Sequence, residues 1–151
     1  MIQNPAPADT KDRLNAGWLA VYRAISLGLA VVFAGVGLLF LLLPGSLLRL
    51  FNDLSVSFGL SSSSIEGINF YIILAVGYMY VVALLAWLMS VHPEEHLLPV
   101  LLLNAKLASS LLSFVFFFYV SHALIYLVNG LVDGLIGAGV FLMDRRLRRL
   151  E

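Results

Sequence analysis

Lys106 and Asp133 are the two residues whose type and position most clearly allow chemistry, because both are ionisable and both lie inside long apolar stretches. These stretches cover residues 97–120 and 123–143. At a rise of 1.5 Å per residue, a helical Lys106 lies about 4 Å from the middle of its stretch, and Asp133 lies at the middle of its own. An ionisable side chain at the centre of a bilayer costs about 2.5–3.5 kcal/mol. The two charges are therefore expected to pair, either as a structural salt bridge or as a proton relay, ion relay or polar-ligand site.

Further polar side chains gather around this pair. Asn129 lies one helical turn before Asp133, and four residues of the preceding stretch recur at helical spacing on one face: Lys106, Ser109, Ser110 and Ser113. Because hydrocarbon offers no hydrogen-bond partners, such groups must face protein or water. We expect them either to line a small cavity or to join the helices through hydrogen bonds, which is the commoner use of serine and asparagine in membranes.

Small residues predict where membrane helices approach one another closely. In the last stretch they form two successive steps of four residues, Gly130, Gly134 and Ala138, and in the first stretch Gly28 and Gly35 offer a matching groove. The pattern does not distinguish packing within the chain from contact with another subunit.

The histidines do not form a recognisable metal or haem site. Residues 92–96 read HPEEH, which differs from the HExxH pattern of zinc proteases and better fits an acidic first helical turn. His122 stands alone at a turn, and the sequence contains no cysteine, which excludes thiol, iron–sulfur and cysteine-zinc chemistry. We predict no catalytic residue, no metal and no cofactor.

The elements that position these residues are four membrane-spanning helices. The chain is 61% hydrophobic and only 12% charged, whereas soluble domains carry about 25% charged residues. Four stretches reach the length of about 20 residues that a spanning helix needs: residues 18–43, 68–90, 97–120 and 123–143. We predict an all-α integral membrane protein in which four antiparallel transmembrane helices form one bundle and a single domain, with a short polar N-terminal tail and a basic C-terminal tail. Between the first two helices, residues 46–51 (SLLRLF) are amphipathic enough to lie along the membrane interface.

Basic residues predict the orientation. Seven basic residues lie near the start of the first helix or after the end of the last helix, on the same side of the membrane, whereas the opposite side has only Arg49. The seven are Lys11, Arg13, Arg23, Arg145, Arg146, Arg148 and Arg149. The positive-inside rule then places both termini in the cytoplasm, and we expect the bacterial inner membrane. The four tail arginines are expected to attract anionic lipid headgroups, with docking of a soluble partner as the alternative.

No family motif accompanies this pattern. Without cysteines the chain cannot belong to the vitamin K epoxide reductases or to the claudin-like proteins. In size, helix number and the proline that ends its first helix it is similar to small bacterial DoxX-like proteins, but no diagnostic motif is present and we assign no family.

With no catalytic, metal or cofactor motif and only one intramembrane charged pair, the sequence favours a non-enzymatic role. We expect an accessory or scaffolding subunit that packs within a larger membrane assembly. The expected partners are other membrane subunits or further copies of the chain, and no nucleic acid. The alternative is a small oligomeric carrier or proton-coupled transporter that uses Lys106 and Asp133, and a lipid-modifying membrane enzyme comes third.

Overall fold

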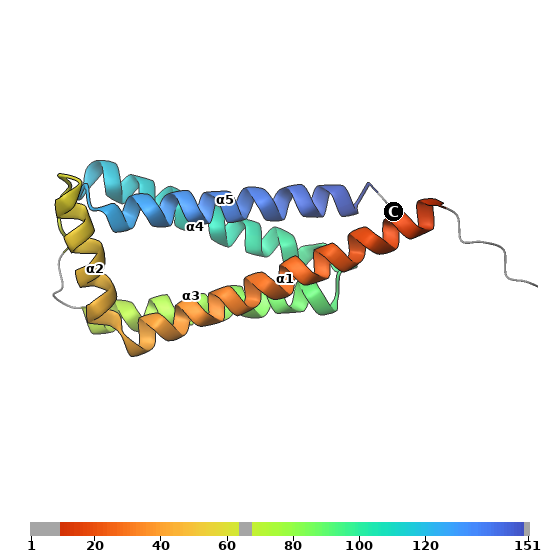
Figure 1. Cartoon of the computed structure of the whole chain (residues 1–151), viewed down its shortest axis with the longest axis horizontal. Helices are drawn as coiled ribbons and strands as arrows, with labels where there is room; N and C mark the ends of the chain where they lie inside the picture. The colour runs from red at the N-terminus through yellow and green to blue at the C-terminus, as the bar shows by residue number, and fades with distance from the viewer. Residues whose placement is uncertain (1–9, 64–67, 150–151) are drawn as a thin grey trace, which may run out of the picture.

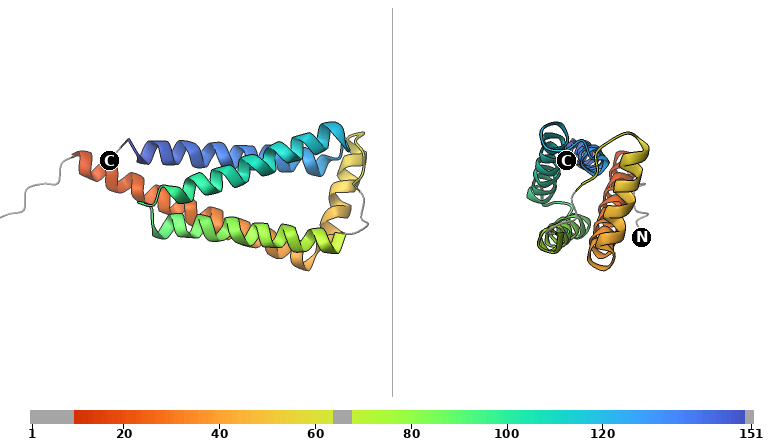
Figure 2. Two further views of the ribbon diagram at one scale, coloured as in Figure 1. Left: turned by 180° about the vertical axis from the view of Figure 1, so that it is seen from behind. Right: turned by 90° about the vertical axis from the view of Figure 1, so that its left-hand side faces the viewer.

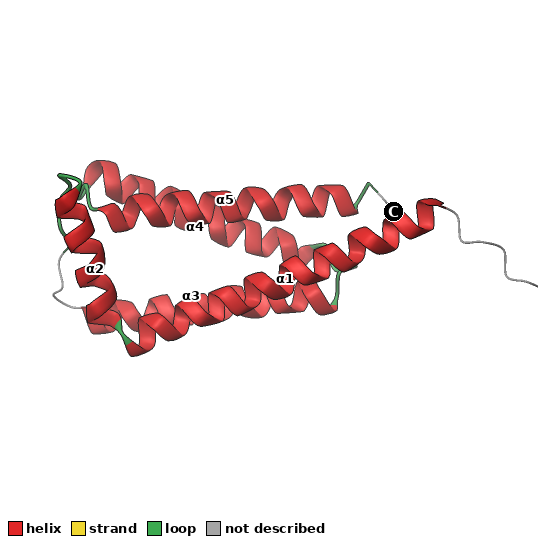
Figure 3. Ribbon diagram, in the orientation of Figure 1, coloured by secondary structure: helices red, strands yellow, loops and turns green. Residues whose placement is uncertain are grey.

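The computed structural model describes residues 10–63 and 68–149, and this part of the chain is helical, with short connections and no strand (Figure 1 and Figure 3). The helices are α1 (Thr10–Leu42), α2 (Pro44–Ser57), α3 (Ile68–Val91), α4 (Leu97–Tyr119) and α5 (Leu124–Leu147). Four of them, α1, α3, α4 and α5, are long and apolar enough to cross a membrane. The predicted fold class, an all-α membrane protein with four spanning helices, is confirmed.

Proline sets the boundary between α1 and α2. Leu43 has a non-helical backbone (φ −132°, ψ 44°), and Pro44 is the first residue of α2. The residue before a proline avoids the helical conformation, while a proline at the first helical position loses no hydrogen bond. At the other end of the chain, α5 continues four residues beyond the predicted end at 143. Asp144, Arg145 and Arg146 are consequently helical.

The spanning helices form two antiparallel pairs. Helix α1 packs along α3, and α4 packs along α5, while contacts between α3 and α4 join the two pairs and α1 touches α5 little. The pairs lie closest where α1 begins and α5 ends, and they diverge toward α2 (Figure 1 and Figure 2). We call the first of these the basic end, because it carries Arg145, Arg146, Arg148 and Arg149, and the second the α2 end.

Burial is inverted relative to a water-soluble domain. Large apolar side chains such as Leu135 and Ile73 are 74% and 69% exposed, whereas Lys106 and Asp133 are 0% and 3% exposed. The apolar core is small and consists of Tyr22, Ala30, Phe33, Val82, Ala86, Met89, Leu102 and Val140. Such an extensive apolar surface around a polar interior is compatible with lipid and not with water. The chain is an integral membrane protein.

Helix α2 lies across one end of the bundle and contacts both pairs through α1 and α5 (Figure 1). The predicted amphipathic segment 46–51 lies within it, and the helix continues to Ser57, into a region expected to be loop. The buried Ser55 Oγ accepts a hydrogen bond of 2.8 Å from the backbone N–H of Leu124, the first residue of α5. The N–H groups of a first helical turn have no partner inside their own helix. Ser55 therefore caps α5 from a distant part of the sequence.

Replacing Ser55 by alanine is expected to destabilise the protein by about 1 kcal/mol, the usual cost of losing a helix cap. The matched control is Ser57→Ala, because Ser57 Oγ donates only to Asp53 O of its own helix, at 2.9 Å. Thermal unfolding in detergent micelles measures the difference. Equal melting temperatures for the two variants would show that the Ser55 bond contributes nothing.

Candidate functional site

Lys106 and Asp133 form an ion pair inside the protein. Lys106 lies on α4 and Asp133 on the adjacent antiparallel α5, and Lys106 Nζ donates a hydrogen bond of 2.8 Å to Asp133 Oδ1. The side chains are 0% and 4% exposed. The two residues meet as their matching depths predicted.

Aromatic rings from the other two spanning helices enclose the lysine. Lys106 Nζ lies 4.3 Å from the ring centre of Phe33 on α1 and 5.1 Å from that of Tyr78 on α3. Both distances are within the range in which a cation is attracted to a ring face. Tyr78 is held in turn by its hydroxyl, which donates 3.0 Å to Ala105 O on α4. All four spanning helices therefore contribute to the environment of one charge.

The carboxylate of Asp133 is only partly satisfied within the described part of the chain. Its Oδ2 atom is buried and accepts no hydrogen bond there. An unpartnered carboxylate oxygen in a low-dielectric interior is costly. It is also the one acceptor of the ion pair that remains available to a proton or another donor.

The predicted supporting residues join α4 to α5 on the α2 side of the pair. Ser110 Oγ donates to Gly130 O at 2.7 Å. Asn129 Nδ2 donates to Ser113 Oγ at 2.8 Å and to Ser109 Oγ at 3.3 Å. These hydrogen bonds connect the helices, which is one of the two roles expected for this face.

The other expected role, a cavity, corresponds to an open groove beside these serines. The groove has a volume of about 460 Å³, and Ser109 and Ser113 line it together with Tyr78, Phe116 and Tyr126. Lys106 and Asp133 do not line it. The ion pair itself is therefore closed off from the groove by surrounding side chains.

The small residues of α5 face α4, with one correction. A Cβ atom at Gly134 would lie 3.0 Å from Ser110 Oγ, and one at Gly130 would lie 3.2 Å from the ring of Phe114. Ala138, predicted as the third member, is exposed. Gly137 takes its place, because the contact continues at helical steps of four and then three residues and brings Lys106 Cβ within 3.7 Å.

The predicted groove of Gly28 and Gly35 packs against no other helix of the described residues. No atom of another part of the described chain lies within 4 Å of a Cβ built on either glycine. They occupy the side of α1 opposite its buried residues Ser26, Ala30 and Phe33. The glycine of α1 that does pack closely is Gly37, 3.1 Å from Met79 Cβ. Of the two roles left open for this pair, packing inside the bundle is thus excluded.

A second charged cluster, which the sequence pattern did not reveal, lies at the basic end. Asp144 Oδ2 accepts 2.9 Å from Arg148 Nε, and Asp144 Oδ1 lies 3.5 Å from Nδ1 of His96 at the start of α4. His92, the other histidine of the HPEEH segment, lies 3.5 Å from Glu94 instead. The two histidines therefore have different partners. Within residues 16–63 and 71–149, whose side chains the structure describes, no three metal-ligating side chains come together.

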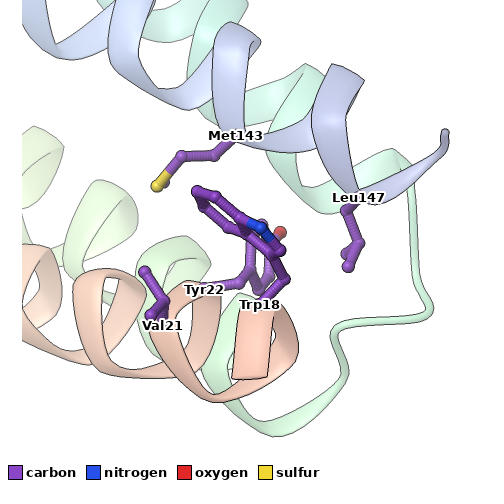
Figure 4. Close-up of a pocket in the computed structure, with 5 residues that line it drawn as sticks. All are labelled: Trp18, Val21, Tyr22, Met143 and Leu147. Atoms are coloured by element: carbon purple, nitrogen blue, oxygen red, sulfur yellow. The ribbon is translucent and has the colours of Figure 1, made fainter. Parts of the chain in front are cut away.

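Helices α1 and α5 meet at the same end through Trp18. The guanidinium carbon of Arg146 lies 3.7 Å from the ring centre of Trp18. Figure 4 shows the indole between the two helices, beside Tyr22 and facing Met143 and Leu147. The cavity that these side chains leave is about 10 Å³, too small to hold more than one water molecule. The contact is a packing contact and does not form a ligand site.

Comparison of the chain with protein-family models, with curated proteins and with solved structures finds no match.

A double-mutant cycle tests whether Lys106 and Asp133 stabilise each other in the folded protein. Lys106→Met and Asp133→Asn should each destabilise the protein on the order of 3–5 kcal/mol, because each leaves a buried group uncompensated. The double variant should recover most of this loss. Unfolding in detergent measures all four proteins. Arg49→Gln serves as the control, because Arg49 is exposed and donates to Gly45 O of its own helix at 3.3 Å, so its loss should change stability by less than about 0.5 kcal/mol. If either single variant were as stable as the parent chain, the interaction between Lys106 and Asp133 would contribute nothing to stability.

Proposed function

We propose that the chain is a non-enzymatic accessory or scaffolding subunit of a larger membrane assembly. The observation that carries this proposal is the closure of the Lys106–Asp133 pair. Both side chains are buried, they are hydrogen-bonded to each other, and rings from α1 and α3 cover the lysine. A pair enclosed in this way holds helices in place, and it is separated from the groove that a substrate would enter.

The outward glycines of α1 support contact with another protein. Gly28 and Gly35 lie on the exposed side of α1 and leave their surroundings open. In a membrane, small residues allow the backbone of a second helix to approach closely, where dispersion and weak hydrogen bonds can act. The proposed partner is therefore a transmembrane helix of another subunit that packs on α1.

Co-purification in mild detergent tests the proposal. The tagged chain should retain a reproducible membrane partner, and Gly28→Leu should reduce the retained amount because the added side chain separates the two helices. Gly77→Leu is the matched control: Gly77 is also exposed, also has open space around it, and lies on α3. Purification of the chain without any other membrane protein, or equal loss with both variants, would contradict the proposal.

A second candidate, a small oligomeric carrier or proton-coupled transporter, is favoured by one specific observation. Asp133 Oδ2 is buried without a hydrogen-bond partner in the described residues, so this oxygen could accept a proton. Liposomes that contain the purified chain and a pH-sensitive dye distinguish the candidates. Proton flux that disappears in a folded Lys106→Met/Asp133→Asn variant would establish the carrier, whereas the subunit proposal expects no flux from either protein.

The orientation that we propose places the basic end in the cytoplasm, in a bacterial inner membrane. Seven basic residues at that end against Arg49 at the other support it. The four tail arginines would then face the cytoplasmic leaflet, where they attract anionic headgroups by about 1 kcal/mol per charge. A reporter fused between Asp53 and Ser62 should be active only when exported, and cytoplasmic activity of that fusion would reverse the orientation.

A further inference from the structure

We propose that the groove between α4 and α5 at the basic end binds one monoanionic phospholipid, with the phosphate at Arg145 and Arg148 and an acyl chain along the two helices. The groove has a volume of about 380 Å³. Its apolar wall includes Val100, Leu103 and Phe141, and its charged residues are Asp144, Arg145 and Arg148. This inference goes beyond the proposed subunit role and is tested on the isolated chain, so the presence or absence of protein partners does not decide it.

The tail arginines are not equivalent, because the fold uses two of them differently. Arg146 lies over the Trp18 ring on the α1 side of α5, away from the groove. Arg148 borders the groove and is oriented by its bond to Asp144. Arg145 borders the groove and forms no hydrogen bond or ion pair with any residue that the structure describes. The exposed guanidinium of Arg145 is therefore the free donor, and Arg148 is a second donor held beside it.

The charge of the groove matches a single phosphodiester. Two arginines and the carboxylate of Asp144 leave one net positive charge. Pro99 and Val100, in the first turn of α4, border the same groove. The first N–H of α4, that of Leu97, donates to Glu95 Oε1 at 3.4 Å, so the attraction for an anion comes from the two arginines.

The depth of the groove distinguishes a phospholipid from a soluble anion. Phe141 precedes Arg145 by four residues on α5, which corresponds to about 6 Å along the helix axis. Leu103 on α4 and Phe141 thus line the part of the groove nearer the membrane centre, while the arginines line the part at the end of the span. A soluble phosphate would use only the arginines, whereas a phospholipid matches both parts.

Native mass spectrometry in dodecyl maltoside tests the inference. Added dioleoyl-phosphatidylglycerol should bind at one molecule per chain, and dioleoyl-phosphatidylcholine should bind markedly less. Arg145→Gln should weaken phosphatidylglycerol binding about tenfold, because the phosphate loses a charge-assisted hydrogen bond from the unpaired guanidinium of the groove. Arg146→Gln is the matched control and should leave the affinity unchanged, because it removes the same charge one position away and outside the groove.

Two further measurements distinguish the contribution of the acyl chain to binding from that of the headgroup. Val100→Trp fills the apolar part of the groove and should abolish binding of the intact lipid, while size-exclusion chromatography and circular dichroism verify that this variant is folded. Glycerophosphoglycerol, the same headgroup without acyl chains, should not compete with the lipid. Equal weakening by Arg145→Gln and Arg146→Gln would show diffuse attraction instead of a site, and competition by the free headgroup would show a soluble-phosphate site; either result overturns the inference.

Discussion

A positive charge at mid-membrane depth is the constraint on which the other contacts of this chain depend. Lys106 is fully buried, and an unpaired ammonium in such surroundings is too costly to persist. Asp133 supplies the acceptor, and Phe33 and Tyr78 supply ring faces. Gly137 packs next to the lysine, since a Cβ at this position of α5 would lie in ordinary contact with Lys106 Cβ, at 3.7 Å. Each spanning helix is thus positioned in part by what the lysine requires.

Polar contacts also join the two helix pairs at three different depths. At the basic end, Arg146 of α5 lies on Trp18 of α1. In the middle, the Tyr78 hydroxyl of α3 donates to α4. At the α2 end, where the pairs diverge, the connection runs through α2, which contacts α1 and whose Ser55 caps α5. Because lipid is as apolar as leucine, apolar contact alone gives membrane helices little reason to associate. Directional contacts of this kind therefore supply much of what holds the two pairs together.

The sequence predicted the features that depend on the length of a helix or on the depth of a residue in it. It did not predict the contacts that depend on which side of a helix faces its neighbours. The four spans and the meeting of Lys106 with Asp133 follow from residue counts along helices. Phe33 and Tyr78 were missed, although both lie near the middle of their predicted spans. For Gly28, Gly35 and Ala138, the sequence could not distinguish packing within the bundle from contact with another subunit, because small residues suit both. The burial pattern of each helix, which a single sequence does not contain, resolves them.

The long-range contacts at the helix ends could not be predicted from the sequence for a different reason. The Ser55–Leu124 cap and the His96–Asp144 contact join residues far apart in the sequence. Their formation depends on how α2 lies across the bundle and on the extra turn of α5. The amphipathic pattern of residues 46–51 indicated a segment at the interface, but it did not indicate that the helix continues to Ser57 or which helix it contacts. The continuation of α5 into the basic tail has no apolar periodicity and looks like a polar connection in the sequence.

The ion pair adds something that packing of small residues cannot supply, namely a unique register. Glycines recur along α5 at Gly130, Gly134 and Gly137, so a shift of α5 by one turn, about 5.4 Å, brings small residues opposite α4 again. The same shift would separate Lys106 from Asp133 and break the Ser110–Gly130 bond. Apolar and small-residue contacts thus permit several alignments of nearly equal energy, while one buried charge pair permits a single alignment. For a subunit whose proposed task is to present a fixed outer surface to a partner helix, that selection of register matters more than the net stability of the pair, which desolvation keeps small.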